Sequence, residues 1–252
     1  MNFTDKYVLV TGASRGIGKA TAIAFAKKGA TVGINYRSND QVAQETLAEL
    51  PGDGHQLFKR DISQKSETEA LINDFIAEFG RLDVLVNNAG ISIFHEIDQV
   101  DFDHWTNAWE KTFQTNLFAV ANLCYWGANA MMKTGGGHIV SVSSRGAFRG
   151  EPTKPAYGAS KAALNSMSQS LAKKLAPHNI YVGVVAPGFT ETEMAKETLT
   201  PAERENLLRE SPFKRMAQPQ EVAHAILFLA SSEAAYSSGT IIDVNGASYL
   251  RS

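Results

Sequence analysis

The sequence has little of what would indicate several common protein classes. Cys124 is the only cysteine among 252 residues, so an internal disulfide cannot form and a thiolate metal site is not expected. The six histidines are scattered without metal-ligand spacing. A formal net charge of -2 gives no support for binding to nucleic acid or to an anionic membrane surface. No apolar run could span a membrane, and the first strand-like segment comes too early for a signal peptide. We therefore expect a soluble cytoplasmic protein without a metal.

Apolar residues, in contrast, make up 44% of the chain, which is ample for the core of one large α/β domain. Short β-rich segments alternate with longer helical ones, without internal repeats or linkers. Strict alternation predicts parallel strands joined by right-handed crossovers. The prediction is one domain over residues 1–252: a doubly wound parallel sheet of the Rossmann type with helices on both faces.

The expected elements follow from the periodicity of the apolar residues. Strands are expected at 7–11, 31–36, 55–61, 82–88, 138–143, 180–186 and 240–244. Helices are expected at 16–28, over the 40s, and at 63–80, 103–132, 156–175 and 219–231. The segment 187–217 breaks this rhythm with three prolines and a glycine.

One stretch combines three side chains that suit proton transfer. Tyr157 and Lys161 are four residues apart on a predicted helix, so they share one face. Ser143 and Ser144 end the preceding strand. An ammonium would lower the pKa of a phenol from its ordinary value near ~10, and a serine hydroxyl could hold a substrate oxygen. Tyr-x-x-x-Lys also occurs on ordinary helices, so this stretch alone leaves a purely structural role open.

Two further clusters stand at the carboxyl ends of predicted strands, where ligands of such sheets bind. The glycine-rich segment 11–18 follows the first strand and opens the first helix. Glycine allows a tight turn and close backbone approach, and a helix N-terminus favours a phosphate, although a simple turn is the alternative. Asn-Asn-Ala-Gly at 87–90 ends the fourth strand, where asparagines also brace neighbouring loops.

In this combination the chain resembles the short-chain dehydrogenase/reductase family over essentially its whole length, and most closely the 3-oxoacyl-acyl-carrier-protein reductase-like branch. The glycine-rich segment is similar to that family's Thr-Gly-x-x-x-Gly-x-Gly, and 87–90 to its Asn-Asn-Ala-Gly. Ser144 precedes Tyr157 by thirteen residues, the family's spacing, and Tyr157 to Lys161 matches its catalytic motif.

The resemblance implies four catalytic residues: Asn116, Ser144, Tyr157 and Lys161. Tyr157 would be the acid or base at the substrate oxygen, which Ser144 would hydrogen-bond. Lys161 would lower the pKa of Tyr157 and hold the nicotinamide ribose. Asn116 would support a water relay behind Lys161, and a helix kink filled by a polar side chain is the structural alternative. Ser143 is the weaker serine candidate, because adjacent strand residues face opposite ways.

The family's coenzyme segments are also present in order. Asp61-Ile62 is similar to its adenine-contacting turn, and Pro187-Gly188 with two following threonines to its nicotinamide-carboxamide segment. The expected coenzyme contacts are Gly12, Ser14, Arg15, Gly16, Ile17, Gly18, Arg37, Ser38, Asp61, Ile62, Asn88, Ala89, Gly90, Tyr157, Lys161, Pro187, Gly188, Thr190 and Thr192.

The end of the second strand favours NADP over NAD. An acidic residue there would bind the ribose hydroxyls and repel a 2′-phosphate, but Tyr36 occupies that position. Arg37 follows, and Arg15 is expected close by, so two guanidiniums could bind the phosphate, with Ser38 adding a hydroxyl. Asp40 could swing towards the ribose, so NAD remains possible.

The resemblance implies an oxidoreductase that interconverts a ketone and a secondary alcohol, most like an NADPH-dependent 3-oxoacyl reductase. A sugar or polyol dehydrogenase using NAD(P) is the alternative among enzymes. A non-catalytic dinucleotide-binding sensor is the alternative of another class. Such a sensor would be expected to lose Tyr157 or Lys161, and both are present.

Substrate specificity is expected to come from the segment at about 189–212, which resembles the family's lid. A short helix is predicted there, with Leu199, Leu207 and Leu208 available to face a substrate. Four apolar residues are either pocket walls or ordinary core: Ile93, Phe94, Phe148 and Phe189. Charged residues after Ser144 are expected in solvent, and one facing the pocket would favour a polar or anionic substrate: Arg145, Arg149, Glu151 and Lys154.

The Tyr157 helix also predicts an assembly. One face is expected to look towards the sheet and the site: Tyr157, Lys161, Leu164, Ser168, Leu171 and Leu175. The opposite face carries residues small enough for another helix to approach: Ala159, Ala163, Ser166 and Ser170. We expect a homotetramer or homodimer through the 103–132 and 156–175 helices. The other expected partner is a small carbonyl or alcohol substrate, not nucleic acid or a membrane.

Overall fold

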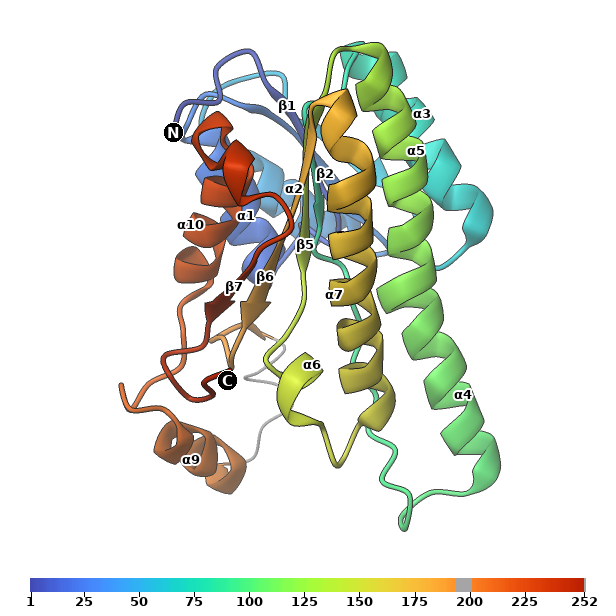
Figure 1. Ribbon diagram of the computed structural model, residues 1–252, viewed down its shortest axis with the longest axis vertical. Coiled ribbons are helices and arrows are strands. Elements are labelled where there is room, and N and C mark those ends of the chain that lie inside the picture. The colour runs from blue at the N-terminus through green and yellow to red at the C-terminus, as the bar shows by residue number, and fades with distance from the viewer. Residues whose placement is uncertain (194–200, 252) are drawn as a thin grey trace.

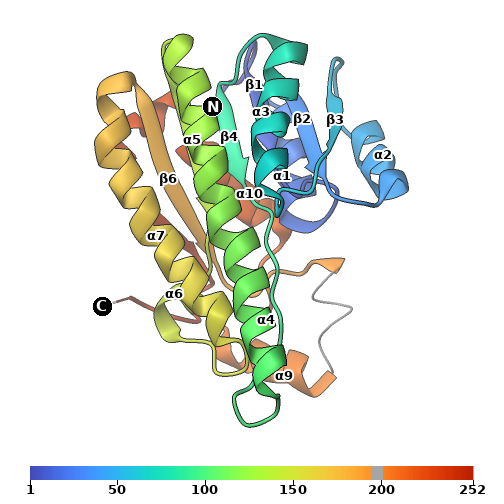
Figure 2. The ribbon, with the colours of Figure 1, turned by 90° about the vertical axis from the view of Figure 1, so that its right-hand side faces the viewer.

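The computed structural model describes residues 1–193 and 201–251 and confirms the predicted α/β fold. One parallel sheet of seven strands has the order β3-β2-β1-β4-β5-β6-β7 (Figures 1 and 2). The strands are β1 Tyr7–Val10, β2 Thr31–Tyr36, β3 Gln56–Lys59, β4 Val84–Asn87, β5 Gly137–Val142, β6 Ile180–Pro187 and β7 Ile241–Val244. Strand β1 pairs with β2 on one side and with β4 on the other, so that Val8 lies opposite both Val32 and Val84.

Helices cover both faces of the sheet, as Figure 1 shows. They are α1 Gly16–Ala26, α2 Asp40–Ala48, α3 Lys65–Phe79, α4 Phe102–Phe113, α5 Ala119–Lys133, α6 Gly146–Arg149, α7 Pro155–Leu175, α9 Pro201–Glu210 and α10 Pro219–Leu229. Short α6 and the 3₁₀ turns Ala176–His178 and Ser232–Ser237 were not expected from the sequence.

Two apolar clusters form the core, one on each face of the sheet. Val8 and Val10 pack with α1 and α10, whereas Leu9 between them packs with α3, α5 and α7. Successive side chains of β1 therefore pack into the cores on opposite faces of the sheet, as expected for a strand covered on both sides. None of the described helices is long and apolar enough to cross a bilayer.

The helix predicted at 103–132 is confirmed as an unbroken helical run from Phe102 to Lys133, with one local departure from α-helical geometry. A π-helical segment, Gln114–Phe118, separates α4 from α5. Such a segment inserts an extra residue into an α-helix and is frequent at functional sites. The buried Asn116 lies in this segment, where it accepts a hydrogen bond from the amide of Ile91 in another loop and donates one to the carbonyl of Ile91; apolar periodicity does not predict these bonds.

The face of α7 expected to look inward does so. Lys161, Leu164, Ser168 and Leu175 are buried, and Tyr157 and Leu171 are half-buried. On the opposite face Ser166 and Ser170 are exposed, and Ala159 and Ala163 are half-buried. Helix α7 begins with Pro155, whose missing N–H costs nothing at a helix start.

Candidate active site

A cavity of about 630 Å³ opens at the carboxyl ends of the central strands. It contains the expected coenzyme contacts except Gly18 and Thr190, and it also contains Ser144. These residues come from seven separate segments of the chain, so the fold brings together residues that lie far apart in the sequence. Thr190 is 7% exposed, and its hydroxyl donates to the carbonyl of Gly188.

Thr11 and Asn88 fasten the glycine-rich loop to the end of β4. The hydroxyl of Thr11 accepts hydrogen bonds from the amides of Asn88 (3.0 Å) and Ala89 (3.1 Å). The Asn88 side chain donates in return to the carbonyls of Thr11 (2.9 Å) and Gly12 (3.1 Å). Asn88 therefore braces the loop, and it also lines the cavity.

Glycine is required at two points of this loop for different reasons. Gly12 has a φ of +61°, a backbone conformation that other residues rarely adopt. A Cβ at Gly18 would lie 2.3 Å from the carbonyl oxygen of Gly12, so any side chain there would push the loop away from α1. Gly18 thus shapes the cavity without lining it.

The N-terminus of α1 fits an anionic group. Its N-cap residue, Arg15, makes no side-chain cap hydrogen bond, and the first turn has no acidic residue. The amide of Gly16 instead donates 3.1 Å to the carboxylate of Glu193, which comes from the segment after β6. The Glu193 carboxylate thus occupies the position at the helix N-terminus where the N–H groups and the helix dipole would favour the phosphates of a dinucleotide.

The candidate catalytic side chains meet at the inner end of the cavity. The hydroxyl of Ser144 interacts with the phenol of Tyr157 and lowers its pKa, and the serine oxygen accepts a 3.0 Å hydrogen bond from the amide of Gly146. The Nζ of Lys161 donates 2.8 Å to the carbonyl of Val142 and lies 5.8 Å from the centre of the Tyr157 ring. Ser143 is buried, and its hydroxyl donates to the carbonyl of Lys161, so Ser144 is the serine that meets Tyr157.

Asn116 is fully buried beneath these residues. Its side chain accepts from the amide of Ile91 (2.8 Å) and donates to the carbonyl of Ile91 (2.9 Å) and to Ser160 (3.2 Å). A Cβ at Gly90 would lie 3.3 Å from the Asn116 oxygen and 3.5 Å from the Lys161 nitrogen. The glycine therefore keeps a Cβ away from both the asparagine oxygen and the lysine nitrogen.

Comparison with known proteins decides the family. The family model described as enoyl-(acyl carrier protein) reductase matches residues 12–247. The 3-oxoacyl-[acyl-carrier-protein] reductase FabG of Escherichia coli is 39% identical over 250 residues, which are 99% of this chain and 100% of that protein. The FabG proteins of Thermotoga maritima and Staphylococcus aureus are 38% and 34% identical, each covering 97% or more of both chains. This chain belongs to the short-chain dehydrogenase/reductase family.

As a short-chain dehydrogenase/reductase, the protein is an oxidoreductase that acts on CH–OH groups with a nicotinamide coenzyme. The donor set at the α1 N-terminus and the glycine-lined cavity fit such a dinucleotide. The described residues contain no group of side chains that could hold a metal ion.

The pKa of Tyr157 shifts in the direction opposite to the one expected from the sequence. Burial raises the pKa of the phenol above its ordinary value, the hydrogen bond from Ser144 lowers it, and the negative charge of Glu151 raises it further. Burial also lowers the pKa of Lys161 to about 8. Desolvation disfavours the charged form of both groups, so the expectation that Lys161 sets the net direction for Tyr157 was wrong for this structure.

Several residues that line the large cavity were not expected from the sequence. Ile91 and Ser92 directly follow the Asn-Asn-Ala-Gly turn, and Glu193 directly follows Thr192, so proximity along the chain could have indicated them. The complete set is Asn35, Asn39, Val42, Arg60, Ile91, Ser92, Thr115, Val142 and Glu193.

None of the four apolar candidates for the pocket wall lines the large cavity. Phe189 and Leu207 line a second cavity of about 270 Å³ next to α9, whereas Leu208 lines neither. Phe94 is 51% exposed, and Phe148 lies against the guanidinium of Arg251. Leu199 lies outside the described residues.

Proposed function

We propose that the protein reduces 3-oxoacyl thioesters to 3-hydroxyacyl thioesters with NADPH. The observation that carries the proposal is the position of Ser144, Tyr157 and Lys161 together on the wall of the cavity that also holds the glycine-rich loop. Two hydroxyls placed in this way suit a substrate oxygen, because one can donate a proton while the other holds the oxygen. The similarity to 3-oxoacyl-[acyl-carrier-protein] reductases indicates the acyl substrate class.

In this mechanism each side chain has one role. Ser144 hydrogen-bonds the substrate carbonyl oxygen and orients it towards Tyr157. The phenol of Tyr157 donates its proton to that oxygen, and its raised pKa keeps the proton in place until the oxygen becomes negative. The bound coenzyme supplies the hydride. Lys161 stabilises the resulting phenolate, and a water between Lys161 and Asn116 returns a proton to Tyr157.

The expected contacts that line the large cavity are proposed to hold the coenzyme, whereas Gly18 and Thr190 are proposed to shape its site without lining the cavity. Arg15 and Arg37 are proposed to bind a 2′-phosphate together with Ser38, since all three line the same cavity. The protein is proposed to work in the cytoplasm, as a homotetramer or homodimer, with the segment at about 189–212 acting as a substrate lid.

Purified protein with acetoacetyl-coenzyme A and NADPH tests the proposal, by the loss of NADPH absorbance. We expect turnover of the 3-oxoacyl thioester and none of crotonyl-coenzyme A, an enoyl thioester without a ketone. A third set of assays offers sugars and polyols together with NAD or NADP in oxidised form. Turnover confined to that set would replace the proposal with a polyol dehydrogenase. NADPH binding without turnover of any substrate would leave a dinucleotide-binding sensor.

A further inference from the structure

Arg145, the residue after Ser144, is buried to an extent unusual for a charged side chain. It is 3% exposed and does not line the large cavity. The sequence placed it in solvent or facing a substrate pocket; the expectation of solvent is wrong, because the side chain is buried and lines the second cavity next to α9. A guanidinium is rarely buried without partners, because taking a charge out of water is costly. Its partners therefore show what this position does.

Three segments from the C-terminal part of the chain hold this guanidinium. It donates to the carboxylate of Glu210 at 2.6 Å and to the hydroxyl of Ser248 at 2.6 Å. It also lies 4.8 Å above the ring of Phe189. Glu210 is the last residue of α9, and Phe189 and Ser248 follow β6 and β7. One side chain thus connects the serine loop to α9 and to the ends of two strands.

The backbone ties the same residue to the catalytic segment. The amide of Arg145 donates 2.9 Å to the carbonyl of Pro187, a residue of the coenzyme cavity. The next amide, that of Gly146, donates to the hydroxyl of Ser144. A shift of Arg145 would therefore move the donor that orients the catalytic serine.

Glu210 is held from two sides. Arg149, at the end of α6, donates 3.0 Å to the same carboxylate oxygen as Arg145. In Figures 1 and 2, α9 and α6 lie at the same end of the molecule, beyond the carboxyl ends of the strands. The Glu210 side chain is 39% exposed, so this pair of contacts can open without unfolding the core.

We propose that Arg145 is a positioning residue that latches α9 to the catalytic-serine loop through Glu210. Docking of α9 and orientation of Ser144 are then one event, so substrate capture and assembly of the proton-transfer site occur together. The proposal rests on the proposed function in so far as α9 belongs to the substrate lid.

Two matched variants on one helix test this latch. Glu210→Gln removes the charge that Arg145 and Arg149 hold. Glu205→Gln makes the same chemical change in an exposed pair with Arg209, where the Glu205 side chain is 66% exposed. We expect Glu210→Gln to raise the KM for acetoacetyl-coenzyme A about tenfold or more, because small misplacements at a reacting site are costly. The dissociation constant for NADPH should stay within about twofold of the wild-type value, since Glu210 lies outside that cavity.

Amide hydrogen exchange provides a readout that does not depend on turnover. In the NADPH-bound protein, residues 201–210 should exchange about tenfold faster in Glu210→Gln than in Glu205→Gln, because the released helix opens more often. Equal exchange in these variants and in wild type would overturn the latch. Faster exchange in a protein that does not reduce acetoacetyl-coenzyme A would support the latch while refuting the proposed function.

A third variant tests whether the two residues act as a pair. The double variant Arg145→Met/Glu210→Gln should raise the KM no more than whichever single substitution raises it more. The effects of substituting two residues that contact each other are not additive. Additive effects would show that Arg145 acts independently of Glu210 and would contradict the proposal. Should Arg145→Met fail to fold, the comparison of Glu210→Gln with Glu205→Gln still decides.

Discussion

The hydroxyl of Tyr36 donates a 2.9 Å hydrogen bond to one carboxylate oxygen of Asp40, and the Nζ of Lys59 donates 2.8 Å to the other. The hydrogen bond with Lys59, followed by that with Tyr36, lowers the pKa of Asp40. Asp40 does not line the coenzyme cavity, whereas Arg37 and Ser38 do. The carboxylate that could have favoured NAD is thus turned to other partners, and this arrangement supports the proposal that the coenzyme is NADP.

Replacing Arg37 should change the choice of coenzyme. We expect Arg37→Ala to lower kcat/KM with NADPH by about tenfold or more, because a charge-assisted contact to the 2′-phosphate is lost. The value with NADH should change little, since that coenzyme has no phosphate at this position. Parallel titrations of both coenzymes measure the ratio. A wild-type enzyme that preferred NADH would contradict the interpretation of this turn.

Tyr157→Phe should separate chemistry from binding. The variant keeps the ring but removes the proposed proton donor, so turnover should fall by ~10²-fold or more. NADPH binding, followed by the change in its fluorescence, should persist because the glycine-rich loop is unchanged. Near-normal turnover would show that another group donates the proton.

Lys161 should give the stability of the protein a particular pH dependence. Its pKa of about 8 in the folded state lies below the ordinary lysine value, because the ammonium is buried. Between these two values the unfolded state binds more protons, so unfolding becomes less favourable as the pH rises above about 8. Relative to Lys161→Met, wild type should gain about 1.4 kcal/mol of unfolding free energy per pH unit in that range.

Urea titrations between pH 7 and pH 9.5 measure this difference. Lys173→Met is the control, because Lys173 is exposed on the same helix. A wild-type advantage over Lys161→Met that stayed constant with pH would contradict the burial effect.

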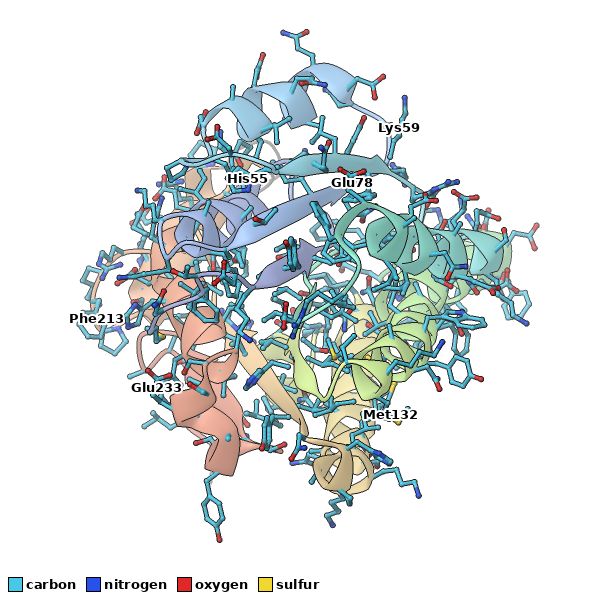
Figure 3. All side chains as sticks on the ribbon, turned by 90° about the horizontal axis from the view of Figure 1, so that it is seen from above. His55, Lys59, Glu78, Met132, Phe213 and Glu233 are labelled. Carbon is cyan, nitrogen blue, oxygen red and sulfur yellow. The ribbon has the colours of Figure 1, made fainter. Side chains whose placement is uncertain are left out.

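An exposed apolar row that begins at the last residue of the π-helical segment and continues along α5 should mediate self-association. Phe118, Tyr125 and Met132 recur every seven residues, which places them on one side of the helix, and they are 51%, 61% and 37% exposed. Met132, near the end of α5, is labelled in Figure 3, which views the molecule from above. Large exposed apolar side chains in a row are typical of interfaces. We expect light scattering to show a dimer or tetramer at micromolar concentration, and Tyr125→Lys to shift it towards the monomer. A monomeric wild type would exclude the proposed assembly.

Much of the fold and the site was predictable because both depend on local patterns. Alternating apolar segments specify strands and helices, and parallel strands place their carboxyl ends together, so the glycine-rich loop, 87–90 and Tyr157 had to meet. The burial of Arg145 could not be predicted, because its partner Glu210 lies 65 residues further along the chain. The pKa of Tyr157 depends on burial, which is a property of the assembled structure.

The π-helical segment around Asn116 has a consequence for how this protein can change. Each residue turns the side-chain direction of an α-helix by about 100°, so one extra residue in Gln114–Phe118 sets the phase of all of α5. Leu123 and Met131, both fully buried, face the core only in that phase. Deleting one residue here would keep a helix but rotate these side chains towards solvent. The position of Asn116 and the packing of Leu123 and Met131, roughly 10 and 22 Å further along the helix, therefore depend on each other: a one-residue insertion or deletion between them would misplace one or the other.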